Sequence, residues 1–475
     1  MPGNHTFFSG SGFFQPLADR LGLGVDQINF VVCQMISLPA SLILYHFLSP
    51  RKVSRNVRLI FHFIVGLSIC FFCFGSAMKH LIWDAVINYV IMRWGPSHHA
   101  HRLVFIIAMG YLSWIHFYRA YLTSSYRIDI TGPMMVLTQK LTSLAFSIHD
   151  GKVKKAELTA IQRRERVERV PNFFEFFSYV FAYQGILCGP SCFYSDFIEF
   201  IDGKHMSTGF KRQTANHNND EYELEYVEPT PWADVKEKML VSSFFLVMNI
   251  VCMPYFPKEA IFGTNRGFLS LVGYLLFYLF LVRSQYYYAW IFSDSVYNAA
   301  GFGFNGFRSD GSARWDLISN VKVWDFETAT SWRDCLEAWN CTTLYWLRRV
   351  AYERSPPRYR TMATYLVSAW WHGFFPGYYF TFLTGALFTV TARVVRRHMR
   401  PYFLDSKAKK LFYDFLTFAA VKLAIMYVAI TFVLLHLQPA FIILGRLYYF
   451  MHIASILLFF GMPGLIRKKP AAKSE

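Results

Sequence analysis

Long apolar runs without a single Lys, Arg, Asp or Glu recur along the chain and alternate with short basic segments. Each of the longest runs has about the length that a helix needs to cross the ~30 Å hydrocarbon core of a bilayer. A soluble domain rarely contains one such run, and here several follow one another. The pattern therefore predicts an all-α, polytopic transmembrane helical bundle. The charge-free runs are 28–48, 59–78, 239–257, 361–392 and 423–445.

Hydrophobicity along the whole chain predicts about nine to eleven membrane segments, some of them re-entrant. Two segments, 81–92 and 132–148, are short and contain Asp84 and Lys140. A charged side chain in lipid is costly, so we expect these two segments to be re-entrant or surrounded by protein. The predicted segments are 28–48, 57–78, 81–92, 103–118, 132–148, 173–188, 239–257, 267–292, 361–390, 411–437 and 439–460.

The apolar segments divide the chain into a short N-terminal part (1–27), one membrane domain (28–466) and a basic tail (467–475). Two polar stretches interrupt the membrane domain. The first, 202–238, carries an acidic run and is predicted to be a solvated loop. The second, 293–360, is rich in tryptophan, and we expect its large rings to pack against the bundle at the membrane interface.

Composition and charge agree with a membrane protein. Hydrophobic residues make up 54% of the chain and charged residues 17%, and the net charge is +17. Much of the basic excess lies in short loops beside the predicted segments, which predicts a cytoplasmic C-terminus and a lumenal N-terminus with the glycosylation signal Asn4-His5-Thr6. No nucleic-acid-binding module accounts for the charge. The basic loops are 51–58, 152–169, 393–410 and 467–473.

Several histidines fall in or beside predicted membrane segments, and each one alone is more often bonded to a neighbouring carbonyl than functional. His372 differs because Gly373 and the Pro376-Gly377 pair follow it directly. Glycine removes bulk beside the imidazole, and proline is expected to leave a backbone carbonyl without its helical partner. The pattern predicts a broken helix with a space beside His372, where a neutral imidazole could take a proton from a hydroxyl.

A segment upstream, 337–354, has the spacing of an amphipathic helix. Asn340 could donate a hydrogen bond to a developing oxyanion, and Arg348 and Arg349 could attract phosphates. Asn340 could instead be a helix cap, and the arginines could reach toward lipid headgroups. From spacing alone the structural roles are favoured.

Other arrangements of reactive side chains do not form a recognisable site. His98-His99-Ala-His101 lies in a polar turn without a matching set of cysteines or carboxylates, so no metal site is predicted. The glycine-rich stretch 301–306 lacks the Lys-Ser/Thr that follows in a phosphate-binding loop. Cys70 and Cys73 lie within an apolar segment and are expected to be buried hydrophobes.

Four motifs, in this order along the chain, give it a resemblance to a known family. They are Trp315-Asp316 with Ser319-Asn-Val, Trp339-Asn340 with Leu-Arg-Arg-Val-Ala-Tyr-Glu-Arg, Trp371-His-Gly-Phe-Phe-Pro-Gly-Tyr378, and Tyr448-Tyr-Phe-Met-His452. In these motifs the sequence resembles the membrane-bound O-acyltransferase family, and within it the lysophospholipid acyltransferase branch. Two further stretches, Gly132–Phe146 and Cys188–Phe197, are also similar to this branch, so the resemblance extends over about residues 110–460.

The resemblance implies an enzyme of the endoplasmic reticulum that transfers an acyl chain from acyl-CoA to the free hydroxyl of a lysophospholipid, in a tunnel enclosed by the helices. It implies His372 as general base and Asn340 as the residue that positions or polarises the reacting groups. Acyl-CoA is then a co-substrate, and no cofactor is expected. The acceptor headgroup (choline, ethanolamine or serine), the acyl chain and the oligomeric state stay open. Further positions expected to contact substrate are Trp315, Asp316, Trp371, Gly373, Pro376, Gly377, Tyr378, His452, Arg348 and Arg349.

Two other functions are compatible with part of this pattern. A relative of the same fold could acylate a protein, a sterol or diacylglycerol, although the branch-specific motifs argue against these acceptors. A transporter would also have many spans and intramembrane histidines, but it would usually show related halves, and no repeat is visible. Lysophospholipid acylation is therefore the main prediction.

Overall fold

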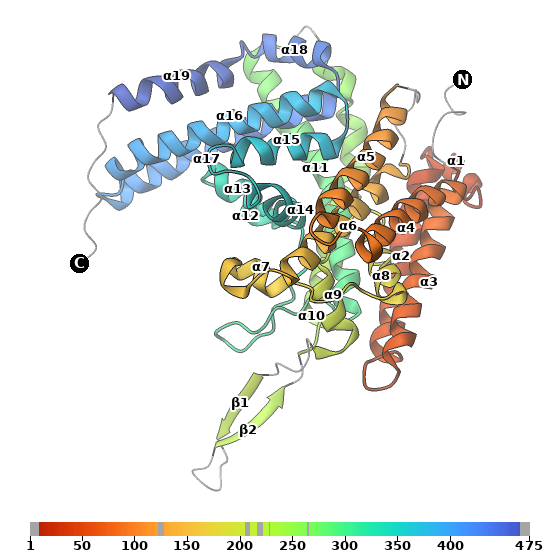
Figure 1. Cartoon of the computed structure of the whole chain (residues 1–475). Coiled ribbons are helices and arrows are strands. Elements are labelled where there is room, and N and C mark those ends of the chain that lie inside the picture. The colour runs from red at the N-terminus through yellow and green to blue at the C-terminus, as the bar shows by residue number, and fades with distance from the viewer. Residues whose placement is uncertain are drawn as a thin grey trace. The chain divides into compact units, whose positions relative to one another are not determined.

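The computed structural model describes residues 9–121, 128–204, 210–215, 222–227, 229–263 and 266–465 (Figure 1). The chain divides into two compact units, Met1–Ser243 with Tyr288–Asn320, and Phe244–Tyr287 with Val321–Glu475. The predicted tail 467–475 and the glycosylation signal at Asn4 lie outside the described residues. The single membrane domain 28–466 and the lumenal segment 1–27 stay predictions.

The first unit is helical apart from one hairpin in the part that the structure describes. α10 (Trp232–Cys252) and α11 (Phe268–Ala299) contribute residues to both units. The other elements of the first unit are α1 (Gln15–Leu21), α2 (Val25–His46), α3 (Arg55–Phe74), α4 (Met78–Trp94), α5 (Ala100–Tyr121), α6 (Thr131–Gly151), α7 (Ala160–Glu165), α8 (Phe173–Val180), α9 (Tyr194–Ile201), β1 (Phe210–Ala215) and β2 (Tyr222–Val227).

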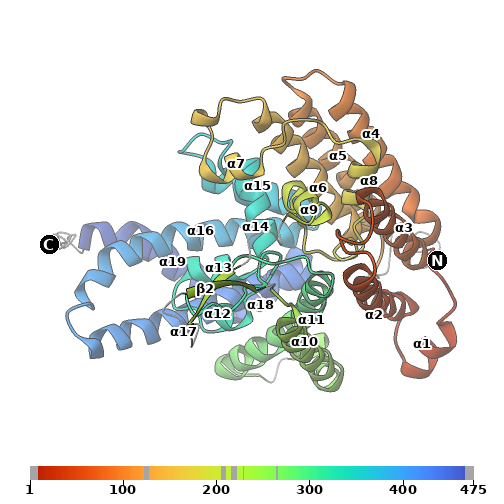
Figure 2. The same cartoon turned by 90° about the horizontal axis from the view of Figure 1, so that it is seen from below.

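The second unit gathers its helices around α16, which packs against α15, α17 and α19 (Figures 1 and 2). Its remaining elements are short, and all of them except α18 precede these helices in the chain. The elements are α12 (Val323–Glu327), α13 (Trp332–Ala338), α14 (Cys341–Leu347), a π-helical turn (Arg348–Tyr352), α15 (Arg360–His372), α16 (Pro376–Met399), α17 (Lys407–Leu434), α18 (Leu437–Arg446) and α19 (Phe450–Leu465).

The membrane character of the chain is confirmed. Seven helical stretches in the described ranges are long and apolar enough to cross a bilayer, or eight if the pair Leu437–Arg446 and Phe450–Gly464, bent by 77°, forms one broken span. The protein is therefore a multi-pass membrane protein. Three of the predicted segments do not count as separate spans. Segments 57–78 and 81–92 fall in one apolar stretch, Arg55–Trp94, segment 132–148 forms the buried helix α6, and segment 173–188 contains only the short helix α8.

Of the two predicted segments with charges, 132–148 is surrounded by protein, as expected, whereas 81–92 leaves one face uncovered, with Trp83 and Val90 59% and 45% exposed. α6 is buried along nearly its whole length, and its Lys140 Nζ donates to the carbonyl oxygens of Tyr179 at 2.9 Å and Val180 at 3.4 Å. Asp84 in α4 is also buried and accepts a hydrogen bond of 2.8 Å from the side chain of Asn88. Buried charges need such partners, which explains why these segments carry them.

The two polar stretches differ in structure. The stretch 202–238 contains the antiparallel hairpin of β1 and β2, with Phe210 paired to Val227, so it is not a plain loop. In the tryptophan-rich stretch, Trp315, Trp332 and Trp346 are buried as predicted, whereas the side chain of Trp324 is 78% exposed.

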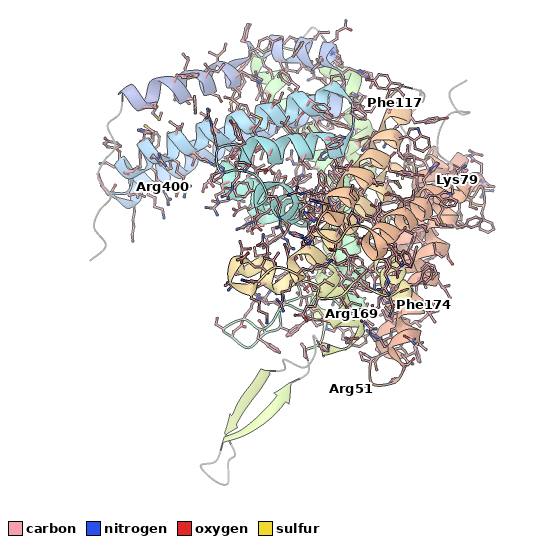
Figure 3. All side chains as sticks on the ribbon, viewed as in Figure 1. Arg51, Lys79, Phe117, Arg169, Phe174 and Arg400 are labelled. Atoms are coloured by element: carbon pink, nitrogen blue, oxygen red, sulfur yellow. The ribbon has the colours of Figure 1, made fainter. Side chains whose placement is uncertain are left out.

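Two of the predicted basic loops meet on one buried carboxylate in the first unit. Arg55 and Arg169 both form ion pairs with Glu175, at 2.7 and 2.6 Å. Figure 3 shows Arg51 and Arg169 toward one end of this unit and Phe117 toward the other. The two loops therefore lie at the same end of the first unit, which is what a shared side of the membrane requires.

Candidate active site

The segment around His372 forms a break between two helices of the second unit. α15 ends at His372, and α16 begins at Pro376. Gly373 has φ 117° and ψ −165°, a conformation that glycine adopts but other residues rarely do. Pro376 occupies the first turn of α16, where its missing N–H removes no helical hydrogen bond. The predicted break is confirmed, but Gly373 rather than Pro376 creates it, so proline does not itself leave a carbonyl without a partner.

The helix that carries His372 selects its tautomer. Nδ1 lies 2.7 Å from the carbonyl oxygen of Ser368, one turn earlier in α15. A carbonyl oxygen only accepts, so Nδ1 is the donor and carries the hydrogen. In the neutral ring the lone pair is then on Nε2. His372 therefore presents one candidate basic atom.

Aromatic rings from three helices surround the imidazole. Its centroid lies 4.8 Å from that of Phe382, 5.3 Å from Phe432 and 5.9 Å from Tyr378. The ring of the buried Trp371 lies 4.7 Å away on α15 itself. These contacts hold the ring plane, and the His372 residue is half-buried among them.

Gly377 fixes the start of α16 against the end of α17. Its N–H donates to the carbonyl oxygen of Leu435 at 2.7 Å. A Cβ at this position would lie 2.6 Å from the carbonyl oxygens of both Leu435 and Thr431, closer than real contacts allow. The absence of a side chain at Gly377 therefore lets two backbones meet, and this contact places the next residue, Tyr378, beside His372.

Asn340 lies between α13 and α14 in a left-handed conformation, with φ 51° and ψ 51°. Asparagine tolerates this region better than most residues other than glycine. Asn340 occupies the cap position of α14, yet its side chain makes no cap hydrogen bond. The preceding backbone is held by a hydrogen bond of 2.9 Å from Lys322 N–H to the carbonyl oxygen of Ala338. The expected amphipathic helix over 337–354 is therefore interrupted, and a capping role does not explain the side chain.

Packing between tryptophans connects the helix that begins after Asn340 with the helix that ends at His372. Trp346, near the end of α14, is fully buried, and its ring lies 5.6 Å from that of Trp371. α14 has seven residues, or roughly 10 Å of helix, between Asn340 and this contact. The two predicted catalytic residues thus belong to one packed set of elements in the second unit.

Sequence reasoning missed a cluster of charged residues in the second unit. Glu327 at the end of α12 accepts hydrogen bonds from Arg283 and Tyr287 of α11 and from Lys422 of α17. The cations lie inside helices that are apolar enough to span a membrane. Arg283 is the only charged residue of the predicted segment 267–292. Because a charge in lipid is costly, its presence there already indicated a buried partner.

A family model described as the membrane-bound O-acyltransferase family matches residues 115–438. The match includes Asn340 and the helix break at His372 and extends over more than half of the chain. The chain belongs to the membrane-bound O-acyltransferase family. The resemblance drawn from the four motifs is thereby confirmed.

Relatives within this family match over nearly the whole chain. Membrane-bound glycerophospholipid O-acyltransferase 2 of Rattus norvegicus is 40% identical over 99% of this chain and 90% of its own length. Membrane-bound glycerophospholipid O-acyltransferase 1 of Mus musculus is 40% identical over 96% and 93%. The lysophospholipid acyltransferase of Saccharomyces cerevisiae is 30% identical over 94% and 76%.

His452, in the last of the four motifs, lies on a different face of α16 from His372. Its Nε2 is 3.1 Å from Thr384 Oγ1, and its ring centroid lies 5.5 Å from that of Phe380. His372 contacts Phe382 instead. At about 100° per residue, positions 380 and 384 share one face and position 382 points to the opposite one. The structure does not bring the two histidines together on α16, and substrate contact by His452 stays a prediction.

The two arginines that follow the Asn340 motif have different surroundings. Arg348 has a half-exposed side chain that pairs with Glu353 at 3.2 Å. Arg349 is buried in the π-helical turn, with 1% of its surface exposed, so it does not extend toward lipid headgroups. Phosphate binding by either arginine stays a prediction.

The motif residues Trp315 and Asp316 belong to the first unit. Trp315 is buried, and its carbonyl oxygen accepts a hydrogen bond of 2.7 Å from Lys238 Nζ. Asp316 accepts a hydrogen bond of 2.7 Å from the side chain of Asn305. Trp315 therefore packs inside the first unit, whereas Asp316 is exposed. Contact of either residue with substrate stays a prediction.

Groups of three or more His, Cys, Asp or Glu side chains placed to hold a metal ion do not occur within the described ranges. The sequence predicted an enclosed reaction tunnel, and it predicted that the protein uses neither a metal ion nor a cofactor. All three stay predictions.

Proposed function

We propose that this protein is a lysophospholipid O-acyltransferase that moves an acyl chain from acyl-CoA to the free hydroxyl of a lysophospholipid. The observation that carries the proposal is the helix break at His372, where Nδ1 is bonded to Ser368 and Nε2 is left as the basic atom. Membership of an O-acyltransferase family and relatives named for glycerophospholipids and lysophospholipids support the same reaction.

His372 would act as general base on the acceptor. Nε2 takes the proton of the lysophospholipid hydroxyl while the hydroxyl oxygen attacks the thioester carbon. The new C–O ester bond forms, the C–S bond breaks, and the proton returns from the imidazole to the departing coenzyme A thiolate. No acyl-enzyme is needed, because the acceptor attacks the thioester directly.

Asn340 would assist the same step through its side-chain amide. An amide N–H can donate to the carbonyl oxygen as negative charge develops on it, and it can orient the thioester before attack. Its place directly before α14, whose Trp346 packs on Trp371 beside His372, supports such a role.

We further propose the endoplasmic reticulum membrane as the location, with a lumenal N-terminus and a cytoplasmic C-terminus. The meeting of two basic loops on Glu175 supports a common side for them, and basic loops tend to be cytoplasmic. Acyl-CoA would then approach from the cytoplasm and the lysolipid from within the bilayer.

An acceptor panel tests the proposed function. Purified protein is incubated with a labelled acyl-CoA and lysophosphatidylcholine, lysophosphatidylethanolamine, lysophosphatidylserine, a sterol, diacylglycerol or a peptide. We expect acylation of at least one lysophospholipid and none of the other three acceptors. Acylation of the sterol, diacylglycerol or peptide without any lysophospholipid product would replace the proposed acceptor.

A further inference from the structure

One charged cluster in the second unit has no part in the chemistry described above. Arg283 Nη2 lies 2.9 Å from Glu327 Oε1, Tyr287 Oη donates to the same oxygen at 2.6 Å, and Lys422 Nζ donates to Oε2 at 2.5 Å. Both carboxylate oxygens are therefore used, and three elements, α11, α12 and α17, meet on one side chain.

The cluster is largely shielded from solvent. The side chains of Arg283, Glu327 and Lys422 are 11%, 19% and 19% exposed. Burial alone would raise the pKa of Glu327, but the charge of Arg283 and the hydrogen bonds of Lys422 and Tyr287 outweigh it and lower this pKa. Removing one member of such a cluster would leave a buried charge without a partner, which is costly. The side chains of the cluster are therefore held firmly in place.

The cluster extends into the aromatic packing around Trp339. The guanidinium of Arg283 and the ammonium of Lys422 lie 5.6 and 5.9 Å from the ring centroid of Phe326, the residue before Glu327. That ring lies 5.0 Å from the ring of Trp339, and Tyr287, which donates to Glu327, has its ring 5.9 Å from Trp339.

Trp339 directly precedes Asn340, and its backbone pairs with Val321 in an isolated antiparallel bridge. Asn340 then turns the chain in the left-handed region before α14 starts. The direction of the Asn340 side chain is thus set by where Trp339 is held and by where α14 begins.

We propose that Glu327 is a positioning residue for acyl transfer, because its contacts with Arg283, Tyr287 and Lys422 hold Trp339 and through it the side chain of Asn340. The inference rests on the proposed function, in which Asn340 acts on the thioester. It assigns a catalytic consequence to a carboxylate of the polar stretch 293–360 and to two cations, Arg283 and Lys422, that lie in apolar helices.

The test compares Glu327→Gln, Glu327→Asp and Glu337→Gln in purified protein. Glu337 is the matched control, because it carries the same group near Asn340 but pairs with Arg333 at the surface, with side chains 51% and 82% exposed. For Glu327→Gln we expect kcat to fall by about tenfold to a hundredfold, with KM for acyl-CoA and for the lysolipid within about twofold of the original values. Glu327→Asp should recover part of the loss, and Glu337→Gln should match the unmodified protein.

A double variant separates positioning from general support of the fold. If Glu327 acts through Asn340, adding Glu327→Gln to Asn340→Gly should lower the residual kcat little further. Should Glu327→Gln fail to fold, Tyr287→Phe removes one hydrogen bond to the carboxylate while keeping the ring against Trp339, and it should lower kcat a few-fold with KM unchanged. An unchanged kcat in the foldable variant, or losses that multiply fully with Asn340→Gly, would overturn the inference. Failure of the unmodified protein to acylate any lysophospholipid would instead overturn the proposed function.

Discussion

At the scale of single residues, the local bonding of His372 does not distinguish it from other helical histidines. His62 and His398 also place Nδ1 2.8 Å from the carbonyl oxygen four residues earlier. The same tautomer therefore arises wherever a histidine folds back along its helix. His372 differs in its position at the end of a helix, beside Gly373, where the chain opens instead of continuing.

Substitutions at Asn340 can separate a role of its side-chain amide in catalysis from a role in the backbone turn. Asn340→Gly keeps the left-handed backbone but removes the amide, whereas Asn340→Ala removes the amide and adds roughly 1 kcal/mol of backbone strain. We expect both variants to lose about a hundredfold or more in kcat, and only the alanine variant to lower the unfolding temperature in detergent. If Asn340→Gly turned over substrate nearly as fast as the unmodified protein, the only role of Asn340 would be to allow the left-handed backbone conformation.

At the scale of elements, the site depends on how α16 begins against the end of α17. The carbonyl oxygens of Leu435 and Thr431 approach Gly377 so closely that no side chain fits between the two helices. This contact fixes the positions of the aromatic rings of Tyr378 and Phe432, which lie 4.5 Å apart and flank the imidazole of His372.

Gly377→Ala should therefore disturb the site through packing. Relief of the overlap requires α16 and α17 to separate, at a loss of about 1 to 3 kcal/mol in the free energy of unfolding, and with it a fall in kcat. The unfolding temperature in detergent and the kcat measure both effects. Gly273→Ala is the matched control, because a Cβ there meets nothing within 4 Å. Equal behaviour of the two variants would contradict this account of the helix contact.

The sequence predicts some of these elements and not others, for physical reasons. Gly373 predicts the break after His372, because glycine is a poor helix former and often ends a helix. The turn at Asn340 has no such signal, because its neighbours on both sides favour an amphipathic helix, and the interruption comes from packing of Trp339. The Glu327 cluster joins residues far apart in the chain, and the face of α16 that meets His452 depends on where α19 packs, so neither follows from local pattern.

At the scale of the whole molecule, membrane character and family follow from composition and four short motifs, whereas the count of spans does not. Apolar length alone cannot tell a lipid-facing helix from one enclosed by protein. α6 has the length of a span, but its burial and Lys140 place it inside the first unit.

Orientation can be tested on this scale. Lys52 and Lys154 are exposed in two of the basic loops. Because both loops reach Glu175 through Arg55 and Arg169, single cysteines at positions 52 and 154 should react with a membrane-impermeant maleimide from the same, cytoplasmic, face of sealed vesicles. Mass tagging on gels reads the labelling. Reaction of the two positions from opposite faces would contradict the arrangement, and reaction of both from the lumenal face would reverse the proposed orientation.

His372 is the proposed base of lysophospholipid acylation. The most direct measurement is the kcat for the best acceptor of the panel in the unmodified protein, in His372→Ala and in His398→Ala, which loses a buried histidine with the same Nδ1 bond. We expect kcat to fall by about a hundredfold to ten-thousandfold in His372→Ala protein that remains folded, and to be retained in His398→Ala. Retained turnover in His372→Ala would contradict this role of His372.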